Sequence, residues 1–284
     1  MIREVERDIY AIDVPLKGNP LKALNSYFIR GKERDLLIDT GFRRDSCREA
    51  LEEALKNLES ERARRSVLCT HLHSDHSGMA DLFAGDNQPI HMSEADTRLH
   101  CRFATGEARK ISHERFLKEG FPSDILALVY STNPARTETM PPGDPRMSPL
   151  RDGQVIRVGE YELQTVLVPG HTPGSISLLD KEHRCLIGGD PIQEDGRIFM
   201  FGVHRDMEAY ITGLQHVWKR ESEFDVIYPS HAKLCVEKDI IPKLIRGAKD
   251  VMDGKVEGKK AELRGNEIAV YDIGVDCFLG TPQD

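Results

Sequence analysis

The chain has 284 residues, with 39 lysines and arginines against 47 aspartates and glutamates, for a formal net charge of −8. This acidic balance argues against a nucleic-acid partner, and 39% hydrophobic with 30% charged residues is typical of a globular protein rather than a disordered or collagen-like one. No stretch approaches the roughly 18 uninterrupted apolar residues of a membrane span, and the chain does not start with a signal-peptide core, so we expect a cytoplasmic protein without a membrane partner.

The first third of the chain alternates short apolar runs with turns. Residues 8–14, 25–30 and 35–41 are bounded by Gly, Pro, Asn or charges, which predicts three strands of one sheet. The apolar period then changes to three and four residues, behind a capping box formed by Ser46 and Glu49. This change predicts an amphipathic helix that packs on the sheet.

The middle of the chain continues the same rhythm and then interrupts it. Residues 66–69 and 88–92 are apolar runs that predict two more strands, so strands and helices alternate as in a layered α/β fold. Helical pieces follow, with Ser93 as a candidate N-cap, and then five prolines within sixteen residues exclude a helix. We therefore predict one domain spanning residues 1–284, with a helical and proline-rich insertion at about 92–150.

The strand pattern resumes after the insertion, and this half of the chain repeats the order of strands followed by a helix. No composition break marks a domain linker. The predicted elements are four strands, a helix, a further strand and a last stretch of one or two strands: 154–158, 161–168, 175–180, 184–190, 206–220, 225–231 and 267–280.

The six cysteines are scattered, without a CxxC pair or the close spacing of a structural zinc site. We expect them to be reduced and mostly buried thiols that fill apolar space.

The strongest chemical signal is a cluster of four metal-ligand residues: His71, His73, Asp75 and His76. Such a spacing arises by chance in a chain of this length on the order of once in a thousand. Because alternate residues of an extended segment point the same way, the first two imidazoles can bind one ion, while the other two side chains turn toward a second position. No cysteine accompanies the cluster, which favours an open catalytic site over a closed structural one.

Three further ligand-type residues follow apolar runs directly: His171, Asp190 and His231. Loops at strand ends converge on one edge of a sheet, where a rigid scaffold holds their side chains in place. One edge could therefore gather all seven residues. Imidazole and carboxylate ligands suit zinc, iron or manganese.

These motifs, THLHSDHSG at 70–78, PGHTPGS at 169–175, GGD at 188–190, PSH at 229–231 and LIDTG at 37–41, resemble the metallo-β-lactamase superfamily in its binuclear hydrolase form. The resemblance implies an α/β fold in the form of a four-layer αβ/βα sandwich. It also implies two divalent ions, with zinc favoured and iron or manganese as alternatives. By this resemblance the first ion takes His71, His73 and His171, the second takes Asp75, His76 and His231, and Asp190 bridges them.

The resemblance assigns further roles outside the ligand set. Asp39 would support the histidine loop by hydrogen bonds without touching metal. Asp75 would act in catalysis as well as in binding, by accepting a hydrogen bond from the metal-bridging hydroxide and returning the proton to the leaving group. Further candidates for a catalytic role are His204, in the loop after Asp190, and Tyr210 and Tyr228, each as a donor to a developing oxyanion.

The predicted function is a metal-dependent hydrolase that directs the bridging hydroxide at a small carbonyl substrate: an ester, thioester, lactone or amide. Two alternatives on the same fold stay open, a phosphodiesterase or endoribonuclease, and an iron-dependent oxidoreductase acting on sulfur compounds or oxygen. We expect a small uncharged or anionic substrate, and we expect the insertion at 92–150 to form a lid over the metal edge or a homodimer contact.

Overall fold

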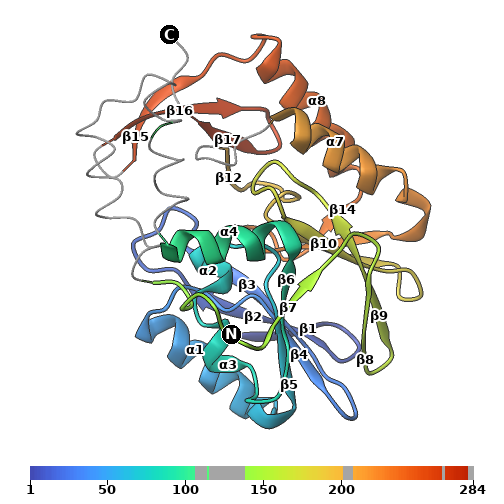
Figure 1. Ribbon diagram of the computed structural model, residues 1–284. Helices are drawn as coiled ribbons and strands as arrows, with labels where there is room; N and C mark the ends of the chain where they lie inside the picture. Colours follow the sequence, from blue (N-terminus) through green and yellow to red (C-terminus); the bar gives the residue numbers. More distant parts are fainter. Residues whose placement is uncertain (106–113, 115–137, 201–206, 264–265, 281–284) are drawn as a thin grey trace.

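The computed structural model describes residues 1–105, 114, 138–200, 207–263 and 266–280 (Figure 1). A seven-stranded sheet is built from the first half of the chain, with its strands in sequence order. The strands are β1 (Ile2–Glu6), β2 (Ile9–Pro15), β3 (Ala23–Ile29), β4 (Asp35–Ile38), β5 (Arg65–Leu68), β6 (Ile90–Ser93) and β7 (Met147–Leu150).

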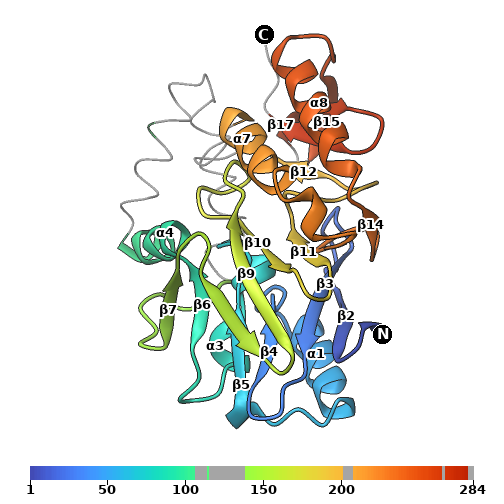
Figure 2. The ribbon, with the colours of Figure 1, turned by 90° about the vertical axis from the view of Figure 1, so that its right-hand side faces the viewer.

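Helices α1 (Asp45–Asn57) and α3 (Ala80–Phe83) cover the outer face of this sheet (Figures 1 and 2). The predicted amphipathic helix is confirmed as α1, but the predicted capping box is wrong. The helix begins one residue before Ser46, after an extended Arg44, and no side chain caps its first turn. The apolar face of α1 packs against sheet residues such as Leu37 and Val67, which removes both layers from water.

A second sheet of six strands faces the first (Figure 2). In spatial order its strands are β14 (Val236–Glu237), β13 (Val226–Pro229), β11 (Cys185–Gly189), β10 (Ile176–Asp180), β9 (Tyr161–Leu167) and β8 (Val155–Val158). Alternate side chains of the two sheets interdigitate in a shared core, where Tyr27 and Ile38 of the first sheet meet Leu178 and Ile187 of the second.

The outer face of the second sheet is covered by helices α7 (Met207–Trp218) and α8 (Ile240–Met252) and by a small third sheet (Figure 1). The predicted four-layer order of helix, sheet, sheet and helix is confirmed, and the third sheet adds to it. Its strands are β12 (Ile198–Phe199), β17 (Cys277–Gly280), β16 (Asn266–Asp272) and β15 (Lys259–Leu263).

The strand directions explain why several loops meet at one edge. In the first sheet β4 and β5 are parallel, and in the second β11 and β13 are parallel. Strand β9 runs the same way as β11, because both are antiparallel to β10 between them. The carboxyl ends of β9, β11 and β13 therefore lie along one edge, as the carboxyl ends of β4 and β5 do in the first sheet.

The insertion predicted at 92–150 connects two neighbouring parallel strands, β6 and β7. Its first helix is α4 (Glu94–Thr105), and residues 106–113 and 115–137 lie outside the described part of the chain. The predicted lid or dimer contact falls largely in those residues and stays a prediction.

None of the described helices has the length and apolar content needed to cross a membrane.

The expectation of mostly buried cysteines is half right. Cys47, Cys69 and Cys185 are buried, whereas Cys101 and Cys235 are exposed and Cys277 is partly so. All six are free thiols, as the sequence predicts.

A buried carboxyl between β16 and β17 should make stability depend on pH. Asp276 is 4% exposed, and burial raises its pKa to about 7. The folded chain therefore keeps this proton up to about pH 7, whereas the unfolded chain releases it near pH 4. The stability that comes from the protonated group is complete at pH values below about 4 and is lost as the pH rises through 7.

Asp276→Asn removes this titration. We expect the free energy of unfolding of the variant to gain about 3 kcal/mol relative to the wild type between pH 5 and pH 8. Urea denaturation of the metal-free proteins at several pH values measures this gain, and Asp13→Asn, at an exposed position, controls for the loss of one charge. Parallel pH profiles for the wild type and Asp276→Asn would show that the carboxyl ionises normally.

Candidate metal centre

The seven predicted ligands come together where the loops of the two sheets meet. His71 follows β5, and His73 precedes the short helix α2 (Ser74–Ser77), whose first turn carries Asp75 and His76. The three later ligands follow strands of the second sheet, one strand each: His171 after β9, Asp190 after β11 and His231 after β13.

The first ligand set consists of His71, His73 and His171. The Nε2 atom of His71 lies 3.0 Å from Nδ1 of His73 and 3.2 Å from Nε2 of His171. The rings meet edge to face, so their nitrogen atoms converge on one point rather than stack. Three nitrogens at these separations can bind a single ion.

The second ligand set consists of Asp75, His76 and His231. The Nε2 atoms of the two histidines lie 3.3 Å apart, and Oδ2 of Asp75 lies 3.9 Å from His76 and 3.7 Å from His231. Two nitrogens and one oxygen therefore face a second common point beside the first.

Asp190 stands between the two ligand sets. Its Oδ2 lies 3.3 Å from Nε2 of His171 in the first set, and its Oδ1 lies 3.1 Å and 3.3 Å from Nε2 of His76 and His231 in the second. Each carboxylate oxygen thus serves a different position. This is the geometry of a bridging ligand.

Hydrogen bonds on the far side of the rings fix which nitrogen points inward. Nδ1 of His171 donates to the carbonyl of Phe199, and Nδ1 of His231 donates to the carbonyl of Ala23, both at 2.7 Å. Because Nδ1 holds the proton, the lone pair of Nε2 is left for a metal ion. The tautomers of these two rings are therefore set by backbone far away in the sequence.

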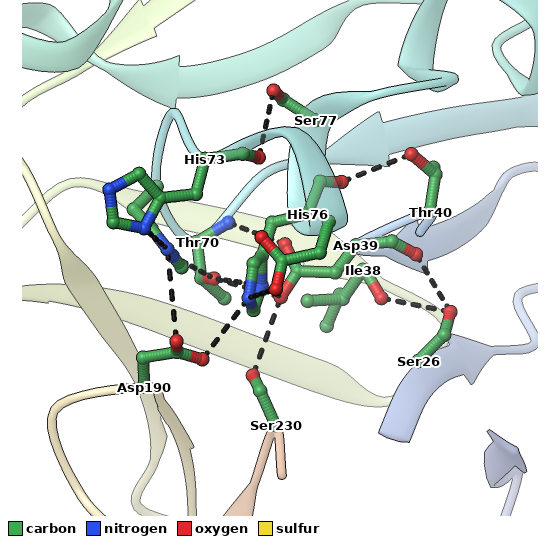
Figure 3. Close-up of polar contacts among 12 residues, drawn as sticks. Ser26, Ile38, Asp39, Thr40, Thr70, His73, His76, Ser77, Asp190 and Ser230 are labelled. Atoms are coloured by element: carbon green, nitrogen blue, oxygen red, sulfur yellow. Dashed lines mark hydrogen bonds and ion pairs between the residues drawn. The ribbon is translucent and has the colours of Figure 1, made fainter. Parts of the chain in front are cut away.

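Asp39 lies beside His76 and Thr70, on the outer side of the histidine cluster, and accepts hydrogen bonds from both (Figure 3). Its Oδ2 accepts a hydrogen bond from Nδ1 of His76 at 2.7 Å and one from the Thr70 hydroxyl at 2.8 Å, while Oδ1 accepts one from the Thr70 backbone. The backbone of Asp39 is left-handed, with a φ of 61°, and the hydroxyl of Ser26 donates a hydrogen bond to its carbonyl oxygen. These hydrogen bonds are of the kind that the predicted supporting role requires, and that role stays a prediction.

Two residues of this support were missed by the sequence reasoning. The hydroxyl of Thr70 lies 3.2 Å from Nδ1 of His71, so it links that ring to Asp39. The hydroxyl of Ser230, the residue before His231, donates to Oδ2 of Asp39 at 3.4 Å (Figure 3). Both are direct neighbours of ligand residues in the sequence, which is the only local signal that they carry.

The electrostatics of the cluster suit cation binding. Burial, together with the nearby His76, holds the pKa of His71 well below its usual range, so this ring is neutral. Burial also lowers the pKa of His76, but the carboxylates of Asp190 and Asp39 outweigh it and hold that pKa well above its usual range. Burial raises the pKa of Asp190, but the imidazoles of His76 and His231 outweigh it and hold that pKa well below its usual range. The bridging carboxylate thus stays ionised and attracts positive charge.

The arrangement passes a test for metal binding. A tetrahedral zinc ion with ligand bonds of about 2.0–2.1 Å holds its ligand atoms about 3.4 Å apart. The separations within both ligand sets, from 3.0 to 3.9 Å, surround this value. Oδ1 of Asp190 is also buried and accepts no hydrogen bond from any residue in the described ranges, although two imidazole nitrogens lie close to it. A cation at the second position would satisfy this oxygen.

Of the remaining predicted residues, Tyr210 and Tyr228 are not part of the cluster. His204 lies in residues 201–206, outside the described part of the chain. Tyr210 is fully buried, and its hydroxyl donates to the carbonyl of Pro191 at 2.8 Å, so the structure gives it a packing role in place of the predicted oxyanion contact. The hydroxyl of Tyr228 likewise donates to the carbonyl of Val5.

The sequence matches the metallo-beta-lactamase superfamily over residues 21–231, a range that includes all seven ligands and Asp39. The chain belongs to this superfamily, as its motifs predict.

Two similar curated proteins are named as thioesterases. Human acyl-coenzyme A thioesterase MBLAC2 is 31% identical over 180 residues, which cover 61% of this chain and 60% of that protein. The chicken protein of the same name is 29% identical over 196 residues, 68% of this chain and 66% of its own. The alignments thus leave a third or more of each relative uncovered. These names support a hydrolase as the class of enzyme.

Solved structures share the fold. A metallo-beta-lactamase family protein from Thermus thermophilus has a TM-score of 0.74 at 22% identity, covering 89% of this chain and 83% of that one. A beta-lactamase domain protein from Burkholderia ambifaria has a TM-score of 0.69 at 19% identity, covering 92% and 81%. The layered architecture is therefore that of the superfamily.

Proposed function

We propose that this protein is a metal-dependent hydrolase of small thioesters, of the acyl-coenzyme A class, with two divalent ions in its centre. The observation that carries the proposal is the place of Asp190, whose two oxygens lie 3.1–3.3 Å from nitrogens of different ligand sets. A carboxylate held in this way can keep two ions a few ångströms apart. Zinc is the ion that the donor set and the spacing favour.

Two bound ions would supply a hydroxide nucleophile near neutral pH, by lowering the pKa of a shared water. The protein side chains then have two tasks. His171 and His231 hold their inward-facing tautomers, and Asp75 accepts the proton of the nucleophile at its Oδ1 atom, since its Oδ2 faces His76 and His231. Water adds to the carbonyl carbon, the carbon–sulfur bond breaks, and the products are a carboxylate and a thiol.

A thioester fits this site better than an amide does. A thiol has a pKa of about 8.5, so it leaves as a thiolate with little help from a general acid, whereas an amine needs full protonation. Within the described residues, Asp75 is the carboxylate of the second ligand set that does not also reach the first, which makes it our candidate for returning a proton. The thioesterase names of the relatives point to the same chemistry.

A panel of substrates on one zinc-loaded preparation tests the proposal. We expect hydrolysis of acyl-coenzyme A thioesters, and weaker or no turnover of a lactone, a β-lactam, a phosphodiester and single-stranded RNA. His71→Ala should lower kcat/KM by at least about a hundredfold, because it removes a ligand of the first set, whereas loss of an outer partner of a ligand costs tenfold to a hundredfold.

His216→Ala is the matched control, since this histidine is partly exposed and pairs with Asp152 instead of facing the centre. The control should keep full activity. RNA cleavage with every thioester untouched, or iron-dependent oxidation of a sulfur compound in place of hydrolysis, would favour the alternatives drawn from the sequence. Thioester hydrolysis that survives His71→Ala would place the activity elsewhere.

Three properties predicted from the sequence accompany this proposal and stay predictions. They are a cytoplasmic location, a homodimer, and a single domain that holds the insertion at 92–150. The negative net charge favours a small-molecule substrate over a nucleic acid.

A further inference from the structure

The carboxylate of Asp96, at the start of α4, joins the two loops that carry the first ligand set. Its Oδ2 accepts hydrogen bonds from the backbone N–H of Leu72 at 2.9 Å and from the hydroxyl of Thr172 at 2.7 Å. Its Oδ1 accepts one from the backbone N–H of Gly174 at 2.8 Å. Leu72 separates His71 from His73, and Thr172 follows His171. One fully buried side chain thus holds both loops.

The position of Asp96 in its helix is suited to this use. The hydroxyl of Ser93 accepts a hydrogen bond from the backbone N–H of Asp96, so Ser93 caps the helix and Asp96 is its third residue. An acidic residue there often turns back to the cap, but this carboxylate faces the ligand loops instead. The partial positive charge of the helix N-terminus stabilises it where it lies.

Gly174 shows how closely the loop approaches α4. A Cβ atom at this position would lie 2.7 Å from both the backbone nitrogen and Oδ1 of Asp96, and closer still to the hydroxyl of Ser93. Only glycine permits this contact. Without the carboxylate, two N–H groups and one hydroxyl in a buried site would lose their acceptor.

We propose that Asp96 is the positioning residue for the first metal position, as Asp39 is for the second. The two aspartates differ in what they hold: Asp39 binds His76 directly and reaches His71 only through Thr70, whereas Asp96 binds the backbone of both loops that carry the first ligand set. The inference rests on the proposed two-ion centre, and it concerns how tightly and how selectively each position retains its ion.

Zinc affinity in single-position backgrounds tests the inference without any substrate. His231→Ala leaves the first ligand set intact, and His171→Ala leaves the second. In the His231→Ala background, Asp96→Asn should raise the zinc dissociation constant about tenfold to a hundredfold. Both oxygens of Asp96 accept hydrogen bonds, so the NH2 group of asparagine would face an N–H or O–H donor of a ligand loop. In the His171→Ala background the change should stay within about threefold, as for sites without shared partners. Competition with a chromogenic chelator measures both constants.

Two control variants sharpen the comparison. Glu94→Gln removes another acidic group from the first turn of α4, where Glu94 pairs with Arg151 at the surface, and should change neither constant. Asp39→Asn should give the opposite pattern to Asp96→Asn, with the larger loss in the His171→Ala background.

Thr172→Val provides a milder test if Asp96→Asn does not fold, because it removes one of the three hydrogen bonds and keeps the carboxylate. It should weaken zinc binding severalfold in the His231→Ala background alone. Equal weakening in both backgrounds, or no weakening in the first, would overturn the role of Asp96. If neither background binds zinc even with Asp96 present, the proposed centre itself fails and this inference fails with it.

Discussion

Asp190→Ala is expected to abolish binding of both ions at once and to reduce hydrolysis by well over about a hundredfold, more than the loss of any outer partner. The reason is that its two oxygens serve different ligand sets, at 3.3 Å from His171 on one side and 3.1 Å from His76 on the other. Without the carboxylate, five histidines and Asp75 are left to attract two cations. Metal analysis after gel filtration, together with thioester turnover, measures the effect.

Asp195→Asn is the matched control for Asp190→Ala. Asp195 lies five residues later, is exposed, and pairs with Lys233. Asparagine also tolerates its left-handed backbone, φ 57°. This variant should keep two ions and full activity. An Asp190→Ala protein that retains one tightly bound ion and most of its activity would contradict the bridging role.

Gly170→Ala is expected to lower the free energy of unfolding by about 3 kcal/mol and to weaken the first ion position. Gly170 has a φ of +126°, and a Cβ atom there would lie 2.5–2.6 Å from the backbone and Cβ of Tyr210. Tyr210 cannot retreat, because it is fully buried, donates to Pro191 and packs on Phe278. The loop that carries His171 must move instead.

Urea denaturation and zinc affinity of the Gly170→Ala protein measure both effects. Gly153→Ala separates backbone strain from the clash, because Gly153 also has a positive φ, +77°, but the nearest atom to its Cβ position is 3.9 Å away. The control should cost about 1 kcal/mol and leave zinc binding unchanged. Equal losses in the two variants would show that the contact with Tyr210 does not hold the loop.

The sequence predicts those parts of the structure that depend on local pattern. The strands that precede the ligands each contain an apolar run, and the histidine cluster lies within six residues. Strand β7 is missed because Pro149 lies in it. A proline is tolerated there since β7 is at the edge of its sheet. Helix α8 is missed because its sequence contains two residues that disfavour a helix, Pro242 and Gly247. Pro242 lies in the first turn, where it is tolerated, and the missing side chain of Gly247 makes room for Ile273.

The supporting contacts of the centre could not be predicted by the same reasoning, because they join residues far apart in the chain. Asp96 is 24 residues from Leu72 and 76 from Thr172. The ring of His231 is oriented by the carbonyl of Ala23, 208 residues away. Spacing shows which residues are able to bind a metal ion, but only packing shows which backbone groups fix their tautomers.

Metal titration of the wild-type protein tests the central claim most directly. Metal-free protein is titrated with zinc, and bound metal and thioester hydrolysis are followed in the same samples. The structure predicts two ions per chain, with hydrolysis rising as the two positions fill, because Asp190 links the ligand sets. Binding of one ion or fewer, with no hydrolysis restored by zinc, manganese or iron, would contradict the two-ion hydrolase.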